Sequence, residues 1–343
     1  MKIWNGYTKG VNLGGWLSQC DYSHEHLEHF IEEKDIATLA DWGVDHLRLP
    51  IDYNILQTED GEWIPQGFTY IQRALDWCEK YHLNLILDLH KTVGYSFDKD
   101  EQETGFFYNK KYQEQFYCLW EEIAKRYAHY VDAVAFELLN EVTDEKTMGA
   151  WNEISQNCIR RIRAFAPTTK ILIVGYWNNC VLAVKDLAEP ADENIVYNFH
   201  CYEPLIFTHQ GAWWLNGMPH DLKVPFAQSN AGIKTLTRNY LPDNEIILEN
   251  IPDDDQPLDS HFFEKLFAEA VAVAEERNVS LYCGEYGVID RAEPSDTLQW
   301  YHNIHEAFAK LQIGHAAWNY KGLNFGITDE HLKEVKDEIV QQM

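Results

Sequence analysis

The sequence of 343 residues contains no run of 18 consecutive apolar residues and few basic residues. A chain without such an apolar run is not expected to cross a membrane as a helix. Lysine and arginine together number 28, against 55 aspartates and glutamates, so the net charge is −27. Nucleic acid and anionic membranes are therefore excluded as expected partners, whereas a neutral ligand such as a sugar is compatible with this charge.

Cysteine pairs are also missing. The seven cysteines are scattered, odd in number and never spaced as Cys-x-x-Cys, which excludes a zinc ribbon and a disulfide framework and favours a reducing compartment. The N-terminal MKIWNGYTKG has no apolar core of the kind that a signal peptide needs. We therefore expect a cytoplasmic location for the chain as it stands, and secretion if a leader has been removed from it. Nothing in the sequence indicates an oligomeric state.

Two motifs of nucleotide-dependent and metal-dependent enzymes are absent from the sequence. No GxGxxG follows the first apolar run, which argues against a dinucleotide-binding doubly wound sheet. No HExxH is present, which argues against a zinc site of the metalloprotease type. We therefore expect neither a cofactor nor a bound metal.

Short apolar runs do alternate with amphipathic helical stretches, such as TYIQRALDWCEKY and HFFEKLFAEAVAVAEER, along almost the whole chain. Eight runs are typical of buried parallel strands: Gly10–Trp16, His46–Asp52, Leu83–His90, Ala133–Glu141, Lys170–Tyr176, Asn194–Tyr202, Val279–Gly287 and Gly314–Tyr320. Eight such units predict an α/β fold, a closed (β/α)8 TIM barrel, with an open doubly wound sheet as the alternative.

The chain is longer than the about 250 residues that such a barrel usually takes. Most of the excess lies between the sixth predicted strand and the helix that begins near His261. Because ordinary βα connections are short, residues 203–260 are expected to form an insertion subdomain over the barrel mouth. We expect residues 1–343 to form a single (β/α)8 catalytic domain that carries this insertion.

Two glutamates lie where an apolar, strand-like run ends and a loop begins. Glu141 ends the run AVAFELLNE, and Glu285 lies inside VSLYCGEYG. Active sites of such barrels lie at the carboxyl ends of the strands, so these two side chains are expected to face each other. Hydrolysis of a glycosidic bond needs such a pair, one carboxyl donating a proton and the other ionised. Glu137, in the middle of its run, is instead expected to be a buried structural glutamate paired with a cation.

Polar and aromatic residues also occupy the ends of the other predicted strands. They include Arg48, His90, Asn140, His200, Tyr202 and Trp318. Arg48 is the natural cation to keep Glu285 ionised, with a purely structural arginine as the alternative. Asn140 is suited to bonding a sugar hydroxyl. His90 could bond a hydroxyl or pair with a carboxylate, and it fits a core histidine equally well.

The remaining candidates are expected to orient the carboxylates or to contact sugar rings. His200 and Tyr202 are two residues apart and so point to the same side of their strand. We expect Tyr202 to orient the nucleophile and His200 to contact the acid/base or the substrate. Trp318 is expected to stack on a pyranose ring. Other candidate platforms near strand ends are Trp16, Phe106, Phe107 and Trp177, while Trp213 and Trp214 either line further subsites or only hold the insertion together.

The set GVNLGGW, HLRLP, LILDLH, FELLNE, YNFHCY, LYCGEYG and AAWNYK resembles glycoside hydrolase family 5, the cellulase A family of clan A, over essentially the whole chain. The resemblance is greatest to clostridial endoglucanase C-type enzymes, which also carry an insertion after the sixth strand. It implies a (β/α)8 barrel and a retaining double displacement, with Glu141 as acid/base and Glu285 as nucleophile. It also implies that the family's other active-site positions are occupied by Arg48, His90, Asn140, His200, Tyr202 and Trp318.

Two positions depart from the family pattern. Lys91 stands where the family often has a second histidine, and Val142 stands where many members have proline. The first departure concerns a contact in the −1 or −2 subsite, so Lys91 is included among the expected substrate-binding residues. The second is expected to matter little.

The sequence therefore predicts a retaining endo-β-glucanase that acts on β-1,4-glucan or mixed-linkage β-1,3/1,4-glucan, as polysaccharide or oligosaccharide. An exo-β-1,3-glucanase or a β-mannanase fits the same catalytic frame. A metal-dependent barrel hydrolase, with Asp88, His90, His200 and Glu141 as ligands, is disfavoured by the nearby arginine. A sugar-binding protein without activity would not need two carboxylates at these positions.

Overall fold

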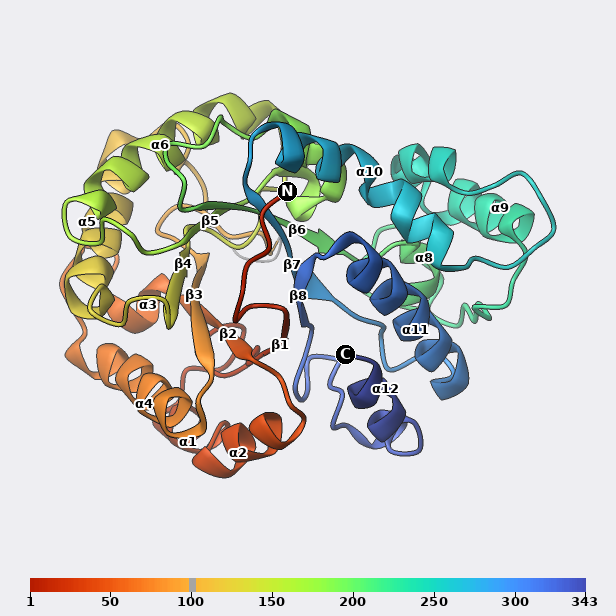
Figure 1. Ribbon diagram of the computed structural model, residues 1–343, viewed down its shortest axis with the longest axis horizontal. Coiled ribbons are helices and arrows are strands. Elements are labelled where there is room, and N and C mark those ends of the chain that lie inside the picture. The colour runs from red at the N-terminus through yellow and green to blue at the C-terminus, as the bar shows by residue number, and fades with distance from the viewer. Residues whose placement is uncertain (99–102) are drawn as a thin grey trace.

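The computed structural model describes residues 1–98 and 103–343, and it shows a closed barrel of eight parallel strands in the order β1 to β8 (Figure 1). The strands are β1 (Lys9–Asn12), β2 (His46–Asp52), β3 (Asn84–Lys91), β4 (Val134–Glu137), β5 (Ile171–Ile173), β6 (Ile195–Cys201), β7 (Ser280–Tyr286) and β8 (Gly314–Ala317). Pairing of β1 with β8 closes the barrel. The predicted (β/α)8 barrel is thereby confirmed.

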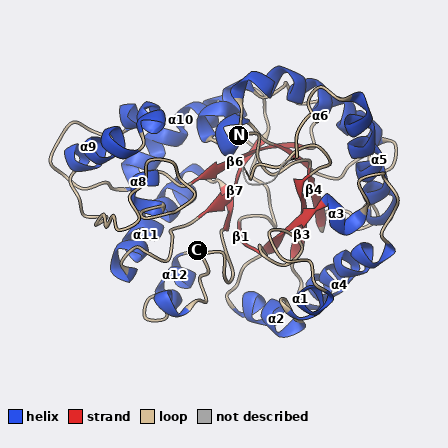
Figure 2. Ribbon diagram, turned by 180° about the vertical axis from the view of Figure 1, so that it is seen from behind, coloured by secondary structure: helices blue, strands red, loops and turns tan. Residues whose placement is uncertain are grey.

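Helices surround the strands on the outside of the barrel (Figures 1 and 2). The α-helices of the described residues are α1 (His24–His29), α2 (Glu33–Asp41), α3 (Tyr53–Leu56), α4 (Pro65–Tyr81), α5 (Lys110–Tyr127), α6 (Met148–Arg163), the short turn α7 (Tyr176–Asn179), α8 (Leu205–Thr208), α9 (Asn230–Tyr240), α10 (Ser260–Glu276), α11 (Pro294–Leu311) and α12 (Lys336–Gln342). Within the described ranges, no helix combines the length and the apolarity that a membrane crossing requires.

The strands are buried on both faces, which is why they read as apolar runs in the sequence. Every residue of β2 is buried, for example. Inside the barrel, an apolar cluster contains one residue from each of six strands: Ile86, Ala135, Leu172, Val196, Tyr282 and Ala316. Trp4 and Tyr7, which precede β1, belong to the same cluster, and their rings stack with centroids 4.0 Å apart. The amino-terminal end of the barrel is therefore filled with apolar side chains, which leaves the carboxyl-terminal end for polar chemistry.

Three buried tryptophans on the surrounding helices fix the backbone just beyond the strand ends. Trp120 on α5 donates its indole N–H to the carbonyl of Leu138, one residue after β4. Trp151 on α6 donates to Val174, one residue after β5, and Trp300 on α11 donates to the carbonyl of Glu203, two residues after β6. Buried indoles need such partners, and here each bond locks a loop that leads into the site.

Strands β4, β5 and β8 are shorter than the apolar runs that predicted them. The run Ala133–Glu141 forms ladder pairs only as far as Glu137. Beyond that point the chain remains tied to its neighbours by single bonds, such as Asn140 N to Leu89 O at 3.1 Å. The strand tips therefore bend away from regular pairing, and this bend positions the polar side chains that follow.

The segment between β6 and α10 contains α8, α9 and the 3-10 helix η3 (Pro242–Asn250). Figures 1 and 2 show α8 and α9 to one side of the barrel, beside α10 and α11. Ile233, Leu248 and Leu258 of this segment are buried in the same apolar core as the barrel helices, while Ala212 packs with Trp318. The segment therefore flanks the barrel at the β6–β7 side.

Candidate active site

The side chains of Glu141 and Glu285 meet at the carboxyl-terminal end of the barrel. Glu141 follows β4 by four residues, and Glu285 is near the end of β7. One carboxyl oxygen of each lies within 4.8 Å of the other and of a ring nitrogen of His200. Both residues are buried, with 7% and 5% of their surface exposed. Two carboxyl groups from distant parts of the sequence therefore share one small, nearly dry site.

Glu285 receives hydrogen bonds on both of its carboxyl oxygens. Arg48 donates from Nη1 to Oε1 at 2.8 Å, and the hydroxyl of Tyr202 donates to Oε2 at 2.9 Å. The preceding residue, Gly284, has its N–H bound by Asn198 at 2.9 Å and its carbonyl bound by Asn12 at 2.9 Å. Donors on both oxygens hold the carboxyl group of Glu285 in one orientation.

Arg48 is fully buried at the centre of a polar layer that joins several strands. Its guanidinium donates two bonds to Glu137 on β4, at 2.7 and 2.8 Å, and lies 3.0 Å from Asp88 on β3. Burial alone would lower the pKa of Arg48, but the carboxylates of Asp88, Glu137 and Glu285 raise it well above its ordinary value. Glu137 is thus the buried, cation-paired glutamate that we expected from its position in the strand.

The same guanidinium orients Asn140, the residue before Glu141. Its Nη2 donates to Oδ1 of Asn140 at 2.8 Å. This bond fixes which end of the amide faces the arginine, so the N–H2 end lies on the other side. Arg48 therefore contributes to the positions of residues next to both glutamates.

Glu141 sits in a less charged environment than Glu285. Its Oε1 is 2.8 Å from Nδ1 of His200, and its Oε2 accepts a hydrogen bond from Nδ2 of Asn178 at 2.7 Å. Burial raises the pKa of Glu141 to about 7, and the hydrogen bond from Asn178 and the charge of Arg48 oppose that rise. A carboxyl with a pKa near neutrality can donate a proton and later take one up.

The two histidines of the site are neutral. Burial lowers the pKa of His90 to about 4 and that of His200 to about 3. Nδ1 of His90 pairs with Oδ2 of Asp88 at 2.6 Å, while Nδ1 of His200 lies between Glu141 and Glu285, 3.6 Å from the latter. Both rings are thus available for hydrogen bonding without adding a positive charge.

Aromatic side chains surround the carboxylates. The ring of Trp318 is parallel to that of His90, with centroids 5.8 Å apart, and it packs with Ala212 of the insertion. From Tyr202, edge-to-face contacts lead through His209 to Trp214. Trp177, Trp213 and Trp214 are 40%, 62% and 37% exposed. These exposed tryptophans come from two different loops, one after β5 and one in the insertion.

The prediction that Trp16 and Phe106 serve as aromatic platforms for sugar rings is wrong, since both side chains are fully buried. Trp16 donates its indole N–H to Leu27 O at 2.9 Å and stacks on Trp77 with centroids 6.0 Å apart. Phe106 packs edge-to-face with Phe107 and Phe116. Position near a strand end did not distinguish these core side chains from accessible ones. Phe107 is also largely buried, with 9% of its surface exposed.

Lys91, at the end of β3, is held beside the neighbouring strand. Its ammonium group lies 4.0 Å from Oδ2 of Asp52 and 5.5 Å from the ring centroid of Tyr22. The hydroxyl of Tyr22 donates to the same oxygen of Asp52 at 2.6 Å. Lys91 follows His90 directly and is 8% exposed, so it stands at the margin of the site.

Sequence reasoning missed three asparagines. Asn12 and Asn198 lie on β1 and β6, where they bind Arg48 and Glu137 respectively, and Asn178 binds Glu141. The signal for Asn12 was its place at the end of the first strand, as for the other site residues. Asn178 lies in a turn whose shape the sequence pattern does not predict.

The family model Cellulase (glycosyl hydrolase family 5) matches residues 5–324. The chain belongs to glycosyl hydrolase family 5. It is 50% identical to cellodextrinase A of Ruminococcus flavefaciens over 308 residues, covering 90% of this chain and 84% of the relative. It is 38% identical to endoglucanase C of Acetivibrio thermocellus over 338 residues, covering 97% of each. This family 5 member is therefore a glycoside hydrolase of the endoglucanase or cellulase type.

Solved structures support the fold of this family 5 enzyme. Endoglucanase Cel5A from Thermotoga maritima superimposes with a TM-score of 0.78 at 20% identity, covering 98% of this chain and 97% of that one. The Clostridioides difficile cellulose synthase subunit Z superimposes with a TM-score of 0.76 at 23% identity, covering 99% of each. At these identities the likeness shows that the barrel is shared.

The four ligands of the alternative metal-dependent hydrolase do not converge in this family 5 barrel. Over residues 1–98 and 103–343, the group whose potential ligand atoms come together is Glu141, His200 and Glu285. Asp88 and His90 are instead paired with each other, and Asp88 also with Arg48. A guanidinium bound directly to Glu285 makes that group a poor site for a cation.

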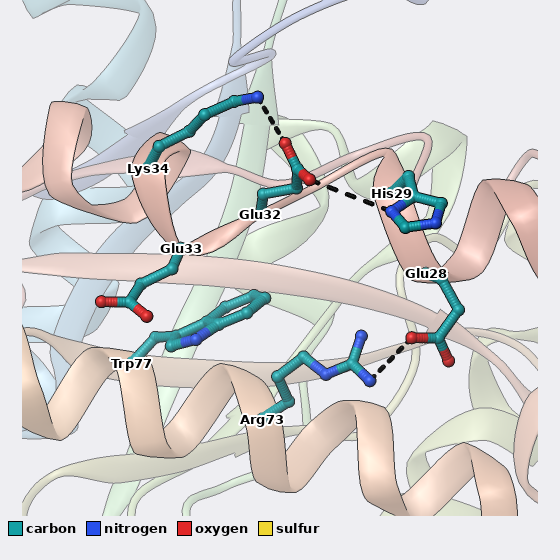
Figure 3. A pocket seen from close by; sticks show the side chains of 7 residues that line it. All are labelled: Glu28, His29, Glu32, Glu33, Lys34, Arg73 and Trp77. Carbon is teal, nitrogen blue, oxygen red and sulfur yellow. Dashed lines mark hydrogen bonds and ion pairs between the residues drawn. The ribbon is translucent and has the colours of Figure 1, made fainter.

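A separate surface hollow of about 580 Å³ lies among α1, α2 and α4 (Figure 3). Its lining residues are Glu28, His29, Glu32, Glu33, Lys34, Arg73 and Trp77. Figure 3 shows ion pairs among these residues, Arg73 with Glu28 and Glu32 with both Lys34 and His29. None of the strand-end residues of the active site lines this hollow.

Proposed function

We propose that this hydrolase cleaves β-1,4-glucan or mixed-linkage β-1,3/1,4-glucan internally and with retention of anomeric configuration, with Glu141 as acid/base and Glu285 as nucleophile. The observation that carries the proposal is the approach of the two carboxyl oxygens to within 4.8 Å. Retaining enzymes hold their carboxyl groups about 5 to 5.5 Å apart, whereas inverting enzymes need about 6.5 to 9.5 Å to admit a water molecule.

In the first step, the carboxylate of Glu285 attacks the anomeric carbon while Glu141 protonates the departing glycosidic oxygen. The bond between that carbon and oxygen breaks as the bond to Glu285 forms, which leaves a glycosyl ester on the enzyme. The bonds from Arg48 and Tyr202 hold the two carboxyl oxygens of Glu285 in place for the attack. Burial raises the pKa of Glu141 to about 7, so a substantial fraction of this group carries a proton near neutral pH.

In the second step, Glu141 is ionised and takes a proton from a water molecule. The water oxygen forms a bond with the anomeric carbon, the bond to Glu285 breaks, and Glu141 returns to its protonated form. A neutral His200 next to both glutamates allows these changes of charge without a competing cation. One carboxyl group can thus perform both halves of the reaction because its pKa lies near neutrality.

In this proposal, the other residues of the site bind the sugar ring. The N–H2 group of Asn140, turned away from Arg48, is placed to donate to a hydroxyl beside the reacting carbon. His90, held by Asp88, offers a second hydrogen bond, and Trp318 provides an apolar surface for a pyranose face. Lys91 lies next to His90 and is assigned to a neighbouring subsite.

The choice of a β-glucan is supported by the names of the relatives, cellodextrinase A and endoglucanase C. Internal cleavage needs binding surfaces on both sides of the reacting bond. The exposed tryptophans after β5 and in the insertion, Trp177, Trp213 and Trp214, are suited to hold further sugar rings. The exo-β-1,3-glucanase and the β-mannanase differ from this proposal in their substrates and products.

A substrate comparison tests the proposal. We expect the viscosity of barley β-glucan to fall rapidly while few reducing ends are released, with slower attack on mannan and laminarin. Soluble cellodextrins should yield cellobiose and longer products. Release of glucose alone from laminarin would support the exo-β-1,3-glucanase, and fastest cleavage of mannan would support the β-mannanase.

A further inference from the structure

The turn after β5 has an unusual backbone. Trp177, Asn178 and Asn179 follow one another with φ of 52°, 55° and 56°, all in the left-handed region. Single non-glycine residues visit this region in a few per cent of cases, most often as asparagine. Three in a row are an outlier, and such outliers persist where the surrounding structure enforces them, frequently at functional sites.

Several hydrogen bonds enforce this turn and tie it to the loop after β4. Asn178 donates its backbone N–H to the carbonyl of Val142 at 2.9 Å, and Val142 donates to Gly175 at 3.4 Å. The side chain of Asn179 accepts from the N–H of Gly175 at 2.9 Å. A side chain at Gly175 would come within 2.7 Å of Cβ of Ala183, so the turn also needs glycine there. The turn is thereby fixed to Val142, the residue that follows Glu141.

As a consequence, the side-chain amide of Asn178 is held next to one carboxyl oxygen of Glu141. Nδ2 of Asn178 lies 2.7 Å from Oε2 of Glu141. The other oxygen, Oε1, faces His200, whose Nδ1 also lies 3.6 Å from Glu285. An amide N–H2 group only donates, so Oε2 must accept. Oε1, on the side of the nucleophile, is then the oxygen that can carry a proton.

We propose that Asn178 is a positioning residue that holds Oε2 of Glu141 as a hydrogen-bond acceptor and thereby assigns the transferable proton to Oε1. The inference rests on the proposed role of Glu141 as acid/base. In the first step it places the proton on the oxygen nearer Glu285. In the second step it stabilises the carboxylate that must accept a proton from water.

The proposal predicts a direction for the titration of Glu141. The titratable and charged groups that face its carboxyl are Arg48 on β2, Asp88 and His90 on β3, His200 and Tyr202 at β6, and Glu285 on β7, with Tyr95 bound to its backbone carbonyl. A donor to the carboxylate favours the ionised form. Removal of the Asn178 donor should therefore raise the pKa of Glu141, which burial already holds near 7.

The test is the pH dependence of kcat/KM for an aryl β-cellobioside in the wild type, Asn178→Gly and Asn178→Asp. Glycine accepts the left-handed backbone, and aspartate keeps the size and local preference of asparagine but cannot donate when ionised. On the alkaline side of the pH profile, kcat/KM falls as Glu141 ionises. We expect the pH at the midpoint of this fall to rise by about 0.5 to 1 unit in Asn178→Gly and further in Asn178→Asp. The second variant keeps the test valid if the first folds poorly.

A matched control is Asn278→Gly, since Asn278 is an exposed left-handed asparagine just before β7, at the opposite end of the barrel. The alkaline midpoint of the pH profile of this variant should equal that of the wild type. An infrared titration of the carboxyl signal that is lost in Glu141→Gln gives the same pKa without turnover. An unchanged or lowered pKa in both Asn178 variants would overturn the inference, whereas full activity of Glu285→Gln would instead overturn the proposed function.

Discussion

At the residue scale, the two glutamates differ because their neighbours differ. Glu285 binds a guanidinium and a phenol, whereas Glu141 binds a neutral imidazole and an amide. The pKa of Glu141 rises to about 7 because burial outweighs these partners. The two carboxyl groups of one site thus lie in different electrostatic environments, as the proposed division into acid/base and nucleophile requires.

The raised pKa of Glu141 predicts a stability change with pH. Its folded pKa of about 7 lies above the ordinary value of 4.5, so the protonated form favours folding below about 4.5 and this contribution is lost as pH rises through 7. Glu141→Gln, which cannot ionise, should therefore gain stability over the wild type above pH 7, by roughly 1 to 3 kcal/mol at pH 8. Thermal unfolding at pH 5 and pH 8 measures the difference.

The control for this experiment is Glu79→Gln, which changes an exposed glutamate on α4. It should leave the pH dependence of unfolding as in the wild type. A stability difference between Glu141→Gln and the wild type that is the same at both pH values would contradict the raised pKa.

Much of the site at this scale could be predicted from the sequence. Glu141, Glu285, Arg48 and His200 come together because parallel strands bring their carboxyl ends to one end of a barrel. The bond from Asn178 could not be predicted, because it depends on three left-handed residues held by neighbouring loops. The burial of Trp16 was missed for a similar reason, since its ring turns outward to Leu27 and Trp77.

At the element scale, Arg48 joins strands that are far apart in the sequence. Its guanidinium contacts Asn12 on β1, Asp88 on β3, Glu137 on β4 and Glu285 on β7. The barrel interior therefore has an apolar layer at its amino-terminal end and a charged, hydrogen-bonded layer beneath the site. The second layer stabilises the barrel only while the arginine is present.

Arg48→Met tests that dependence. The substitution leaves buried carboxylates without their cation, and breaking a buried ion pair typically costs about 3 to 5 kcal/mol. We expect the denaturant concentration at the midpoint of unfolding to fall accordingly. Lys333→Met, which removes an exposed pair with Glu330, should change the unfolding free energy by less than about 0.5 kcal/mol. A loss below about 1 kcal/mol in Arg48→Met would show that the layer is not a stability element.

At the scale of the whole molecule, the number and order of the strands follow from the sequence, because buried runs alternate with amphipathic helices along most of the chain. The place of the insertion in the sequence, between the sixth strand and α10, also follows, because that connection is too long for an ordinary βα loop. Its placement beside the barrel does not, because it depends on whether its apolar residues, such as Ile233 and Leu258, pack toward α10 or toward the mouth. Only tertiary packing decides between those surfaces.

The insertion also carries a prediction about long substrates. Trp213 and Trp214 are exposed beyond Tyr202 and His209, so they should contact sugar rings away from the reacting bond. Replacing both by alanine should raise KM for barley β-glucan about 3- to 10-fold and change kcat/KM for an aryl β-cellobioside by less than about 2-fold. Equal losses on both substrates would mean that these tryptophans only hold the insertion together.

The central claim is a covalent intermediate on Glu285. A 2-deoxy-2-fluoro-β-cellobioside with a good leaving group forms the glycosyl ester quickly and hydrolyses it slowly, so the intermediate accumulates. Mass spectrometry of the intact protein should show one added fluorinated cellobiosyl group, and digestion should place it on the peptide that contains Glu285. A protein that turns over this substrate without adduct, or an adduct on Glu141, would contradict the account.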